Sequence, residues 1–214
     1  METKAFIKKY KVISIARGIY GQDLFALATA LQKGGLRLIE LTFDQKDPNH
    51  IQKTGEGIAL LNTIEGVQVG AGTVLNLEQL QAAYTAGAKY IVSPNVDANI
   101  IKATKELGLV SIPGACTPTE IMQAYHAGAD FVKVFPAMPL GMEYLKAVCL
   151  PLNHIPFIAN AGIDQNNLQD ILKIGFAGAG ISNYLSDKNI IAKGDFEEFI
   201  KRAQKIMHIV EQAQ

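Results

Sequence analysis

The chain has 214 residues, 49% of them hydrophobic and 19% charged, so it can bury one sizeable core, and we expect a single domain over residues 1–214. Twenty basic residues balance twenty acidic ones without any block of like charge, which argues against nucleic acid or an anionic membrane as a partner. The first ten residues lack the apolar core of a signal peptide, and no apolar run is long enough to span a membrane. We therefore expect a cytoplasmic protein.

Short runs rich in β-branched residues alternate with helical patterns along the whole chain. The runs predict eight strands, at Val12–Ala16, Leu36–Leu41, Val67–Ala71, Lys89–Val92, Leu109–Pro113, Asp130–Phe135, Ile155–Ala159 and Ala177–Ile181. Between the strands, Leu24–Leu31 and Leu77–Tyr84 are predicted helices, and Asp23 is placed to cap the first of them. After the last strand we expect a loop at Asp187–Gly194 and a final helix at Phe196–Val210.

Several predicted helices end on a glycine that leads directly into the next strand, at Gly34-Gly35, Gly87, Gly128 and Gly175. Glycine suits the left-handed conformation just past a helix C-terminus, so these junctions are typical of loops from helix to strand. Regular alternation of strand and helix argues for a parallel sheet. Eight such units in roughly 200 residues fit a (β/α)8 TIM barrel, of the α/β class, better than an open doubly wound sheet.

Lys133 lies in the middle of Asp130–Phe135, a run that otherwise resembles an interior strand. Burial disfavours the ammonium form, so a lysine among valine and phenylalanine can present a neutral amine near pH 7. Such an amine attacks ketones to form a Schiff base. Because side chains alternate along a strand, Phe131, Lys133 and Phe135 share one face. The alternative is an ordinary strand lysine that is exposed to solvent.

Functional residues of a parallel barrel collect at the carboxyl ends of its strands. These ends offer Arg17, Glu40 with Thr42, Gly72 with Thr73, Ser93-Pro94, Pro113-Gly114, Lys133 with Phe135, Asn160 with Gly162, and Gly180 with Ser182. Glu40 is surrounded by aliphatic residues in the sequence, so burial would raise its pKa toward a value useful for moving protons. The alternative for Glu40 is a structural ion pair with Arg17, Arg37 or Lys133, which does not exclude catalysis.

No metal or other cofactor is predicted, because none of the four histidines pairs with a second ligand at a useful spacing. An aldol reaction in this protein would run through an imine rather than a metal enolate. Gly162, Gly178 and Gly180 offer backbone N–H groups that could surround a phosphate near the last two strands. Glycines also mark strand ends for packing reasons alone, so this signal is weak.

Five motifs combine these candidate residues. They are Leu38-Ile39-Glu40-Leu41-Thr42, Gly70-Ala71-Gly72-Thr73-Val74-Leu75, Ser93-Pro94, Ile112-Pro113-Gly114 with Thr117-Pro118-Thr119-Glu120, and Val132-Lys133-Val134-Phe135-Pro136-Ala137. In this order and spacing they resemble the class I 2-keto-3-deoxy-6-phosphogluconate (KDPG) and 4-hydroxy-2-oxoglutarate (KHG) aldolases, from about Val12 to Leu185. The resemblance implies a (β/α)8 barrel, usually a homotrimer. It also implies a carbon–carbon lyase that splits a 2-keto-4-hydroxy acid into pyruvate and an aldehyde.

The resemblance also implies roles for individual residues. Lys133 would be the Schiff-base lysine, and Glu40 would be the acid and base. The implied substrate contacts are Arg17 to a substrate anion, Thr73 and Pro94 in the pyruvyl pocket, Phe135 beside the imine, and Asn160, Gly162 and Ser182 toward the far end of the substrate.

Three departures from the family pattern all lie where the far end of the substrate should bind. Asp44 is an acid in a stretch where many members carry arginine or asparagine, and it would repel a carboxylate or phosphate. Ala159–Ile163 has one glycine fewer than the Pro-Thr-Gly-Gly-Ile turn of the family, and Gly180–Asn183 replaces a Gly-Gly-Ser or Gly-Ser turn. We therefore expect weakened recognition of a 6-phosphate, with an unphosphorylated or shorter acid cleaved comparably well.

Two other functions remain open from the sequence. The same barrel can be repurposed as a ligand-binding protein, because a fold does not fix a function. It can also serve a phosphate-binding isomerase or decarboxylase, which the missing glycines disfavour.

Overall fold

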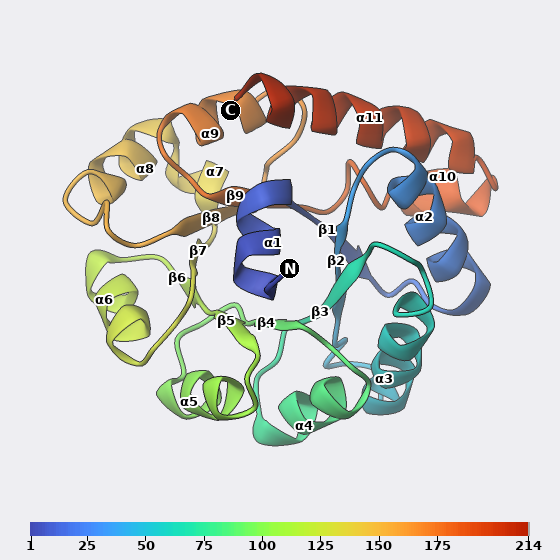
Figure 1. The fold of residues 1–214 in the computed structure, drawn as a ribbon, viewed down its shortest axis with the longest axis horizontal. Coiled ribbons are helices and arrows are strands. Elements are labelled where there is room, and N and C mark those ends of the chain that lie inside the picture. The colour runs from blue at the N-terminus through green and yellow to red at the C-terminus, as the bar shows by residue number, and fades with distance from the viewer. Residues whose placement is uncertain (214) are drawn as a thin grey trace.

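The computed structural model describes residues 1–213, in which a parallel sheet is rolled into a barrel inside a ring of helices (Figure 1). The strands are β1 Val12–Arg17, β2 Leu38–Thr42, β3 Gln68–Gly72, β4 Tyr90–Val92, β5 Val110–Ile112, β6 Gly114–Ala115, β7 Val132–Val134, β8 Phe157–Asn160 and β9 Gly178–Ile181. They lie in the order β5-β4-β3-β2-β1-β9-β8-β7-β6. β5 and β6 are separated only by Pro113, so they occupy one position between β4 and β7 and close a barrel of the TIM type.

The helices follow the strands around the outside of the barrel (Figure 1). They are α1 Thr3–Tyr10, α2 Gly21–Lys33, α3 His50–Leu61, α4 Leu77–Thr85, α5 Ala98–Glu106, α6 Pro118–His126, α7 Ala137–Leu140, α8 Met142–Cys149, α9 Leu168–Lys173, α10 Lys188–Ala192 and α11 Phe196–Gln212. Within residues 1–213, no helix has the length and apolar character needed to cross a membrane.

All eight predicted strands are confirmed, and the predicted last helix is α11. The glycine junctions are confirmed as well, because Gly35, Gly87, Gly128 and Gly175 all have positive φ. The predicted capping role of Asp23 is wrong. Tyr20 occupies the N-cap position of α2, and Asp23 lies inside the first turn, where a negative charge favours the helix dipole instead.

The loop predicted at Asp187–Gly194 is wrong in its middle part, where Lys188–Ala192 forms α10. The side chain of Asp187 accepts a hydrogen bond from the backbone N–H of Asn189 at 2.8 Å and so caps this short helix. Ile191 is buried against the hydrophobic core, which holds the helix on the barrel. The sequence does not predict α10 because its 5 residues are too few to display a helical period.

Helix α1, for which the sequence analysis predicted no element, closes the amino-terminal end of the barrel. It lies across the barrel axis in Figure 1, and the chain passes from it directly into β1. Ile7 of α1 is fully buried. Its cluster lines the inside of the barrel and also contains Ile13, Leu38, Tyr90, Val92, Val110, Ile112, Phe131 and Ile158. This end of the barrel is therefore filled by apolar side chains.

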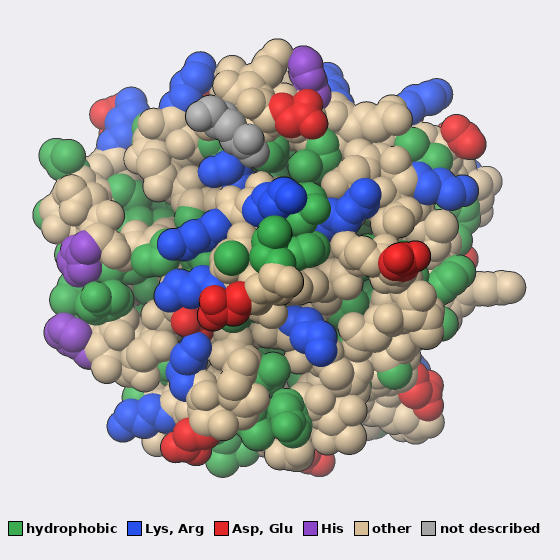
Figure 2. Space-filling view, viewed as in Figure 1, with side chains coloured by type: hydrophobic (Ala, Val, Ile, Leu, Met, Phe, Trp, Pro, Cys, Tyr) green, Lys and Arg blue, Asp and Glu red, His purple; other side chains and the backbone are tan. Residues whose placement is uncertain are grey.

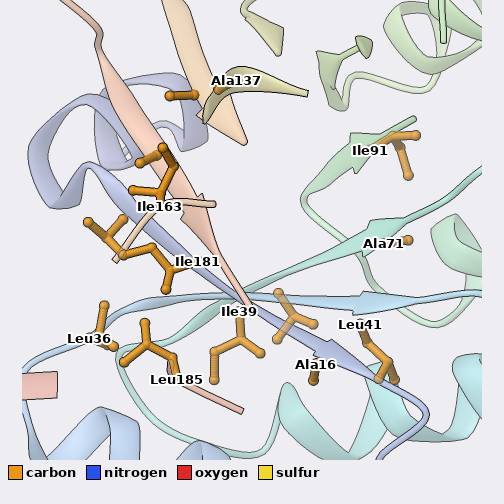
Figure 3. Close-up of a cluster of buried hydrophobic side chains, with 14 of the residues drawn as sticks. Ala16, Leu36, Ile39, Leu41, Ala71, Ile91, Ala137, Ile163, Ile181 and Leu185 are labelled. Atoms are coloured by element: carbon orange, nitrogen blue, oxygen red, sulfur yellow. The ribbon is translucent and has the colours of Figure 1, made fainter. Parts of the chain in front are cut away.

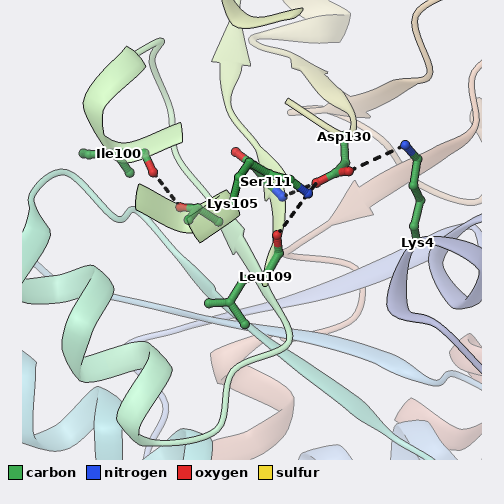
Figure 4. A network of polar contacts seen from close by, with 7 residues as sticks. Lys4, Ile100, Lys105, Leu109, Ser111 and Asp130 are labelled. Carbon is green, nitrogen blue, oxygen red and sulfur yellow. Dashed lines mark hydrogen bonds and ion pairs between the residues drawn. The ribbon is translucent and has the colours of Figure 1, made fainter. Parts of the chain in front are cut away.

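Asp130 ties α1 to the strands at the same end (Figure 4). Its carboxylate pairs with Lys4 of α1 at 3.5 Å and with Lys105 of α5, and it accepts the backbone N–H of Ser111 at 3.0 Å. Figure 2 shows this face of the molecule, with lysine and arginine side chains gathered across its middle. Asp130 is thus a structural residue at the end of the barrel away from the carboxyl ends of the strands.

A second, larger apolar cluster fills the space between the barrel and the helices (Figure 3). Ile39 and Leu41 of β2 and Ile181 of β9 belong to it. On β7, Val132 and Val134 point to this outer layer. Because side chains alternate along a strand, the side chain of Lys133, between these two valines, points into the barrel.

Candidate active site

Glu40 lies in the middle of β2 and shares the inner face of this strand with Leu38. Its side chain is only 4% exposed. In the neighbouring β3, a Cβ atom added to Gly72 would lie 1.8 Å from Oε1 of Glu40. Gly72 therefore provides the space that the carboxyl group occupies, and a larger residue at this position would displace it.

Burial raises the pKa of the Glu40 carboxyl group, because desolvation penalises the carboxylate. The positive charges of Lys133 and, more weakly, Arg17 oppose this rise. Arg37, a third candidate partner, is engaged elsewhere: its guanidinium donates to the backbone carbonyls of Gln32 and Leu36 at 2.6 and 2.9 Å. Glu40 is thus a buried carboxyl group suited to accepting and returning a proton.

Lys133 is the central residue of β7, between Gly114 of β6 and Ile158 of β8. It is 5% exposed, so the alternative of a solvent-exposed strand lysine is wrong. Desolvation lowers the pKa of Lys133 from 10.5 to about 8; the charge of Glu40 opposes this shift and that of Arg17 adds to it. An amine of this pKa is partly neutral near pH 7 and can act as a nucleophile.

Phe135 contacts this lysine, and Pro94 lies against its strand neighbour Gly114. The Nζ atom of Lys133 is 5.0 Å from the centroid of the Phe135 ring, within the range of a cation–π contact. The carbonyl oxygen of Pro94 would lie 2.5 Å from a Cβ atom on Gly114, the strand neighbour of Lys133. Both residues are therefore close to the position where an imine on Lys133 would form.

Thr73 and Arg17 meet at the ends of β3 and β1. Nη2 of Arg17 donates to Oγ1 of Thr73 at 3.4 Å. The carbonyl of Thr73 accepts from Nε2 of Gln45 at 3.1 Å, and Oε1 of Gln45 accepts from the buried Gln79 at 2.8 Å. This chain of hydrogen bonds fixes Thr73, whose φ is +58°. Gln45 and Gln79 have no distinctive sequence signal, and the sequence analysis did not identify them.

The predicted far-end residues are only partly brought together. Ser182 follows β9 and lines a cavity of about 400 Å³ that Arg17 also lines. The side-chain amide of Asn160 lies against Gly180 of β9, where Nδ2 would be 3.1 Å from an added Cβ atom. Asn160 and Ser182 thus border the same pair of strands at their carboxyl ends.

Among the residues that the structure describes, neither Gly162 nor Asp44 lines this cavity. A Cβ atom on Gly162 would be 2.7 Å from that of Met138, and the Gly162 carbonyl accepts from Asn167 at 2.8 Å. Asp44 accepts the backbone N–H of Lys46 at 3.1 Å. Within residues 1–213, no group of three histidine, cysteine or acidic side chains is placed to hold a metal ion.

A buried lysine of lowered pKa and a buried carboxyl group, both inside the barrel at the middle of their strands, are suited to imine chemistry and characterise the class I aldolases. The sequence model of the KDPG and KHG aldolase family matches residues 3–202. The chain therefore belongs to the KDPG and KHG aldolase family. It is a class I aldolase, a carbon–carbon lyase that splits 2-keto-3-deoxy acids into pyruvate and an aldehyde.

Individual relatives agree with this family. The chain is 32% identical over 206 residues to a 2-dehydro-3-deoxy-phosphogluconate aldolase of Treponema pallidum, covering 95% of each chain. It is 31% identical over 183 residues to a 2-dehydro-3-deoxy-6-phosphogalactonate aldolase of Escherichia coli, covering 83% of this chain and 85% of the relative. It also superimposes on a KDPG aldolase of Legionella pneumophila, solved with pyruvate captured as a covalent carbinolamine, with a TM-score of 0.82, 25% identity and 95% and 97% coverage.

Proposed function

We propose that Lys133 is the nucleophile of this aldolase and that Glu40 is its acid and base. The observation that carries this assignment is the pairing of two buried ionisable groups in the barrel, with the pKa of Lys133 lowered to about 8 and that of Glu40 raised. Each group is thereby moved toward neutral pH, where one serves as an amine nucleophile and the other exchanges protons.

The reaction then follows from these two side chains. The neutral amine of Lys133 attacks the keto carbon C2 to give a carbinolamine. Protonated Glu40 donates its proton to the carbinolamine hydroxyl, so that water leaves, a cationic imine remains and Glu40 becomes a carboxylate. Glu40 takes the proton from the C4 hydroxyl as the C3–C4 bond breaks, so the aldehyde leaves and the electron pair of the bond forms an enamine. Glu40 returns a proton to C3, and water releases pyruvate from Lys133. The ring of Phe135 lies 5.0 Å from Nζ and favours the positive charge of the imine.

The remaining predicted contacts arrange the substrate around this pair. Thr73 and Pro94 border the pyruvyl part, and Arg17 contacts a substrate anion. Asn160, Gly162 and Ser182 are assigned to the far end of the substrate, although Gly162 makes its contacts with Met138 and Asn167. The family match favours this aldolase over a ligand-binding protein, an isomerase or a decarboxylase on the same barrel.

The proposal extends to assembly and location. A homotrimer acting on small keto acids in the cytoplasm, without nucleic acid or membrane partners, fits the balanced charge of the chain and its exposed apolar side chains. Among the latter, Leu77 is 57% exposed and Leu150 is 77% exposed. Covering such residues against a second copy would remove apolar surface from water.

Borohydride reduction in the presence of pyruvate tests the assignment of Lys133. We expect one pyruvyl adduct per chain, located on Lys133 by peptide mass spectrometry, because only the neutral amine forms the imine. Lys133→Met should abolish the adduct, whereas the control Lys201→Met, on an exposed position of α11, should retain it. An adduct distributed over surface lysines, or a fully modified Lys133→Met protein, would rule the assignment out.

A further inference from the structure

The cavity of about 400 Å³ contains a second cation that the mechanism above does not use. Arg17 enters it from the end of β1, Ser182 and Asn183 from the segment after β9, and Lys188 from α10. All four side chains are polar and exposed, so a ligand in this cavity would meet two cations, a hydroxyl and an amide.

The cavity adjoins the imine site through Arg17. This guanidinium hydrogen-bonds Thr73 at 3.4 Å, and its charge influences the pKa of both Glu40 and Lys133. The cavity and the proposed imine site therefore share Arg17. A substrate joined to Lys133 through C2 and extended past Arg17 would reach this cavity with its far end.

Lys188 is folded back over the loop that follows β1. Its Nζ atom would be 2.9 Å from a Cβ atom on Gly18, the residue after Arg17, so the ammonium group comes close because Gly18 has no side chain. The segment before α10 is fastened to β1 as well, since Oγ of Ser186 bonds the carbonyls of Ile15 and Ser182 at 2.8 and 3.0 Å. The backbone at Lys188 is thus placed beside the loop after β1 by these hydrogen bonds.

Neither cation of the cavity, Arg17 or Lys188, forms a direct ion pair in the part of the chain that the structure describes. Asp187 also lines the cavity, but its carboxylate caps α10 by accepting the N–H of Asn189 at 2.8 Å. The cavity therefore presents two cations without a direct ion-pair partner, against the one carboxylate of Asp187 that caps α10.

We propose that Lys188, together with Arg17, binds the anionic group at the far end of the substrate, either a phosphate monoester or a carboxylate. This inference rests on the proposed function, in which C2 of the substrate is held on Lys133. Both anions accept several charge-assisted hydrogen bonds, and two cations with neighbouring hydroxyl and amide groups match that need. Lys188 thereby becomes a specificity-determining residue of this chain.

This assignment refines the expectation of a weakened phosphate subsite. The sequence predicts a loop at Asp187–Gly194, whereas Lys188 begins α10 and lines the cavity. The weakened subsite stays a prediction: we still expect the 6-phosphate to confer an advantage well short of a thousandfold. Lys188 accounts for the preference for the phosphorylated substrate that remains. The test compares KDPG, its dephosphorylated analogue and KHG, which respectively end in a phosphate, a neutral hydroxyl and a carboxylate.

The decisive variants are Lys188→Met and Lys188→Arg. Loss of one charge-assisted contact corresponds to a decrease of roughly 10-fold to 100-fold in kcat/KM, mainly through KM. We expect this decrease in Lys188→Met for the anionic substrates and a much smaller change for the dephosphorylated analogue, with most of the loss restored in Lys188→Arg. Lys193→Met, one residue past α10, is the matched control and should behave as wild type.

The outcomes separate the possibilities. A decrease for KDPG alone identifies a phosphate subsite, and a decrease for KHG alone identifies a carboxylate subsite. An equal decrease for all three substrates, or none for any, would overturn the proposal. Titration of KDPG into Lys133→Met protein, with and without Lys188→Met, measures the subsite without the imine. Weaker binding in the double variant would support the Lys188 subsite even if pyruvate trapping failed and the proposed function fell.

Discussion

The pKa of Lys133 predicts how the reaction depends on pH. With a pKa of about 8, roughly one tenth of the amine is neutral at pH 7, and this fraction rises with pH until it levels off above 8. We expect kcat/KM, and the rate of pyruvate trapping, to follow the same rising limb. Steady-state rates between pH 6 and 10 measure it, and a midpoint near 10.5 would contradict the burial argument.

Arg17 provides an internal control for this limb. Its positive charge contributes to the lowered pKa of Lys133, so Arg17→Met should move the limb to higher pH as well as weaken substrate binding. Loss of a binding residue alone would change KM without moving the midpoint.

Replacing Glu40 by glutamine removes the proposed acid and base while keeping the shape of the side chain. We expect kcat to fall by about 100-fold or more, the usual scale for a general acid or base. Because the carboxylate opposes the lowering of the Lys133 pKa, the rising limb should also move to lower pH in Glu40→Gln. Circular dichroism checks the fold, and the exposed Glu65→Gln is the matched control. Near wild-type turnover would assign the proton transfer to another group.

Helix α1 contributes to stability from the end of the barrel opposite the imine site. Ile7 is fully buried there, so Ile7→Ala should lower the free energy of unfolding by about 2–5 kcal/mol, the range for a large core truncation. Urea unfolding measures this loss, and Lys8→Ala, on the exposed face of α1, is the control. The folded variant should keep its kcat. A loss within experimental error of the control would mean that α1 is only loosely attached.

The elements differ in how far the sequence predicts them. The strands were evident because both of their faces are buried, which leaves continuous apolar runs between glycine junctions. The same apolar setting made Lys133 and Glu40 conspicuous. Helix α1 is not predicted from the sequence because it buries a single side chain, that of Ile7, and so has no apolar face among its lysines. Helix α10 is not predicted because its 5 residues are too few to show a helical period.

Contacts between the segments that follow neighbouring strands are the least predictable. Lys188 is an exposed lysine whose position depends on Gly18, 170 residues earlier in the chain, and the placement of Thr73 depends on Gln45 and Gln79. Local patterns carry no information on such pairings, because the strand order of the closed barrel creates them. The resemblance implies residues at both ends of the site, and only the structure adds Lys188 to the far end.

At the scale of the whole molecule, the proposed homotrimer predicts a mass three times that of the 23.1 kDa chain. Closed symmetry gives a defined limit to assembly, so the trimer should persist unchanged as protein concentration rises. Sedimentation equilibrium over a range of protein concentrations provides the measurement. A molecular mass equal to that of one chain at every concentration would exclude the trimer.

The filled amino-terminal end of the barrel also determines the order in which substrates bind and products leave. Ile7, Tyr90 and Phe131 occupy that end, so Lys133 is approached from the carboxyl ends of the strands. If the imine forms on Lys133 as proposed, the pyruvyl part of the substrate is the inner part and the aldehyde is the outer part. We then expect the aldehyde to depart first and pyruvate last in cleavage, and pyruvate to enter before the acceptor in the reverse direction. Product inhibition should therefore be competitive for pyruvate and noncompetitive for the aldehyde, the signature of an ordered uni-bi enzyme.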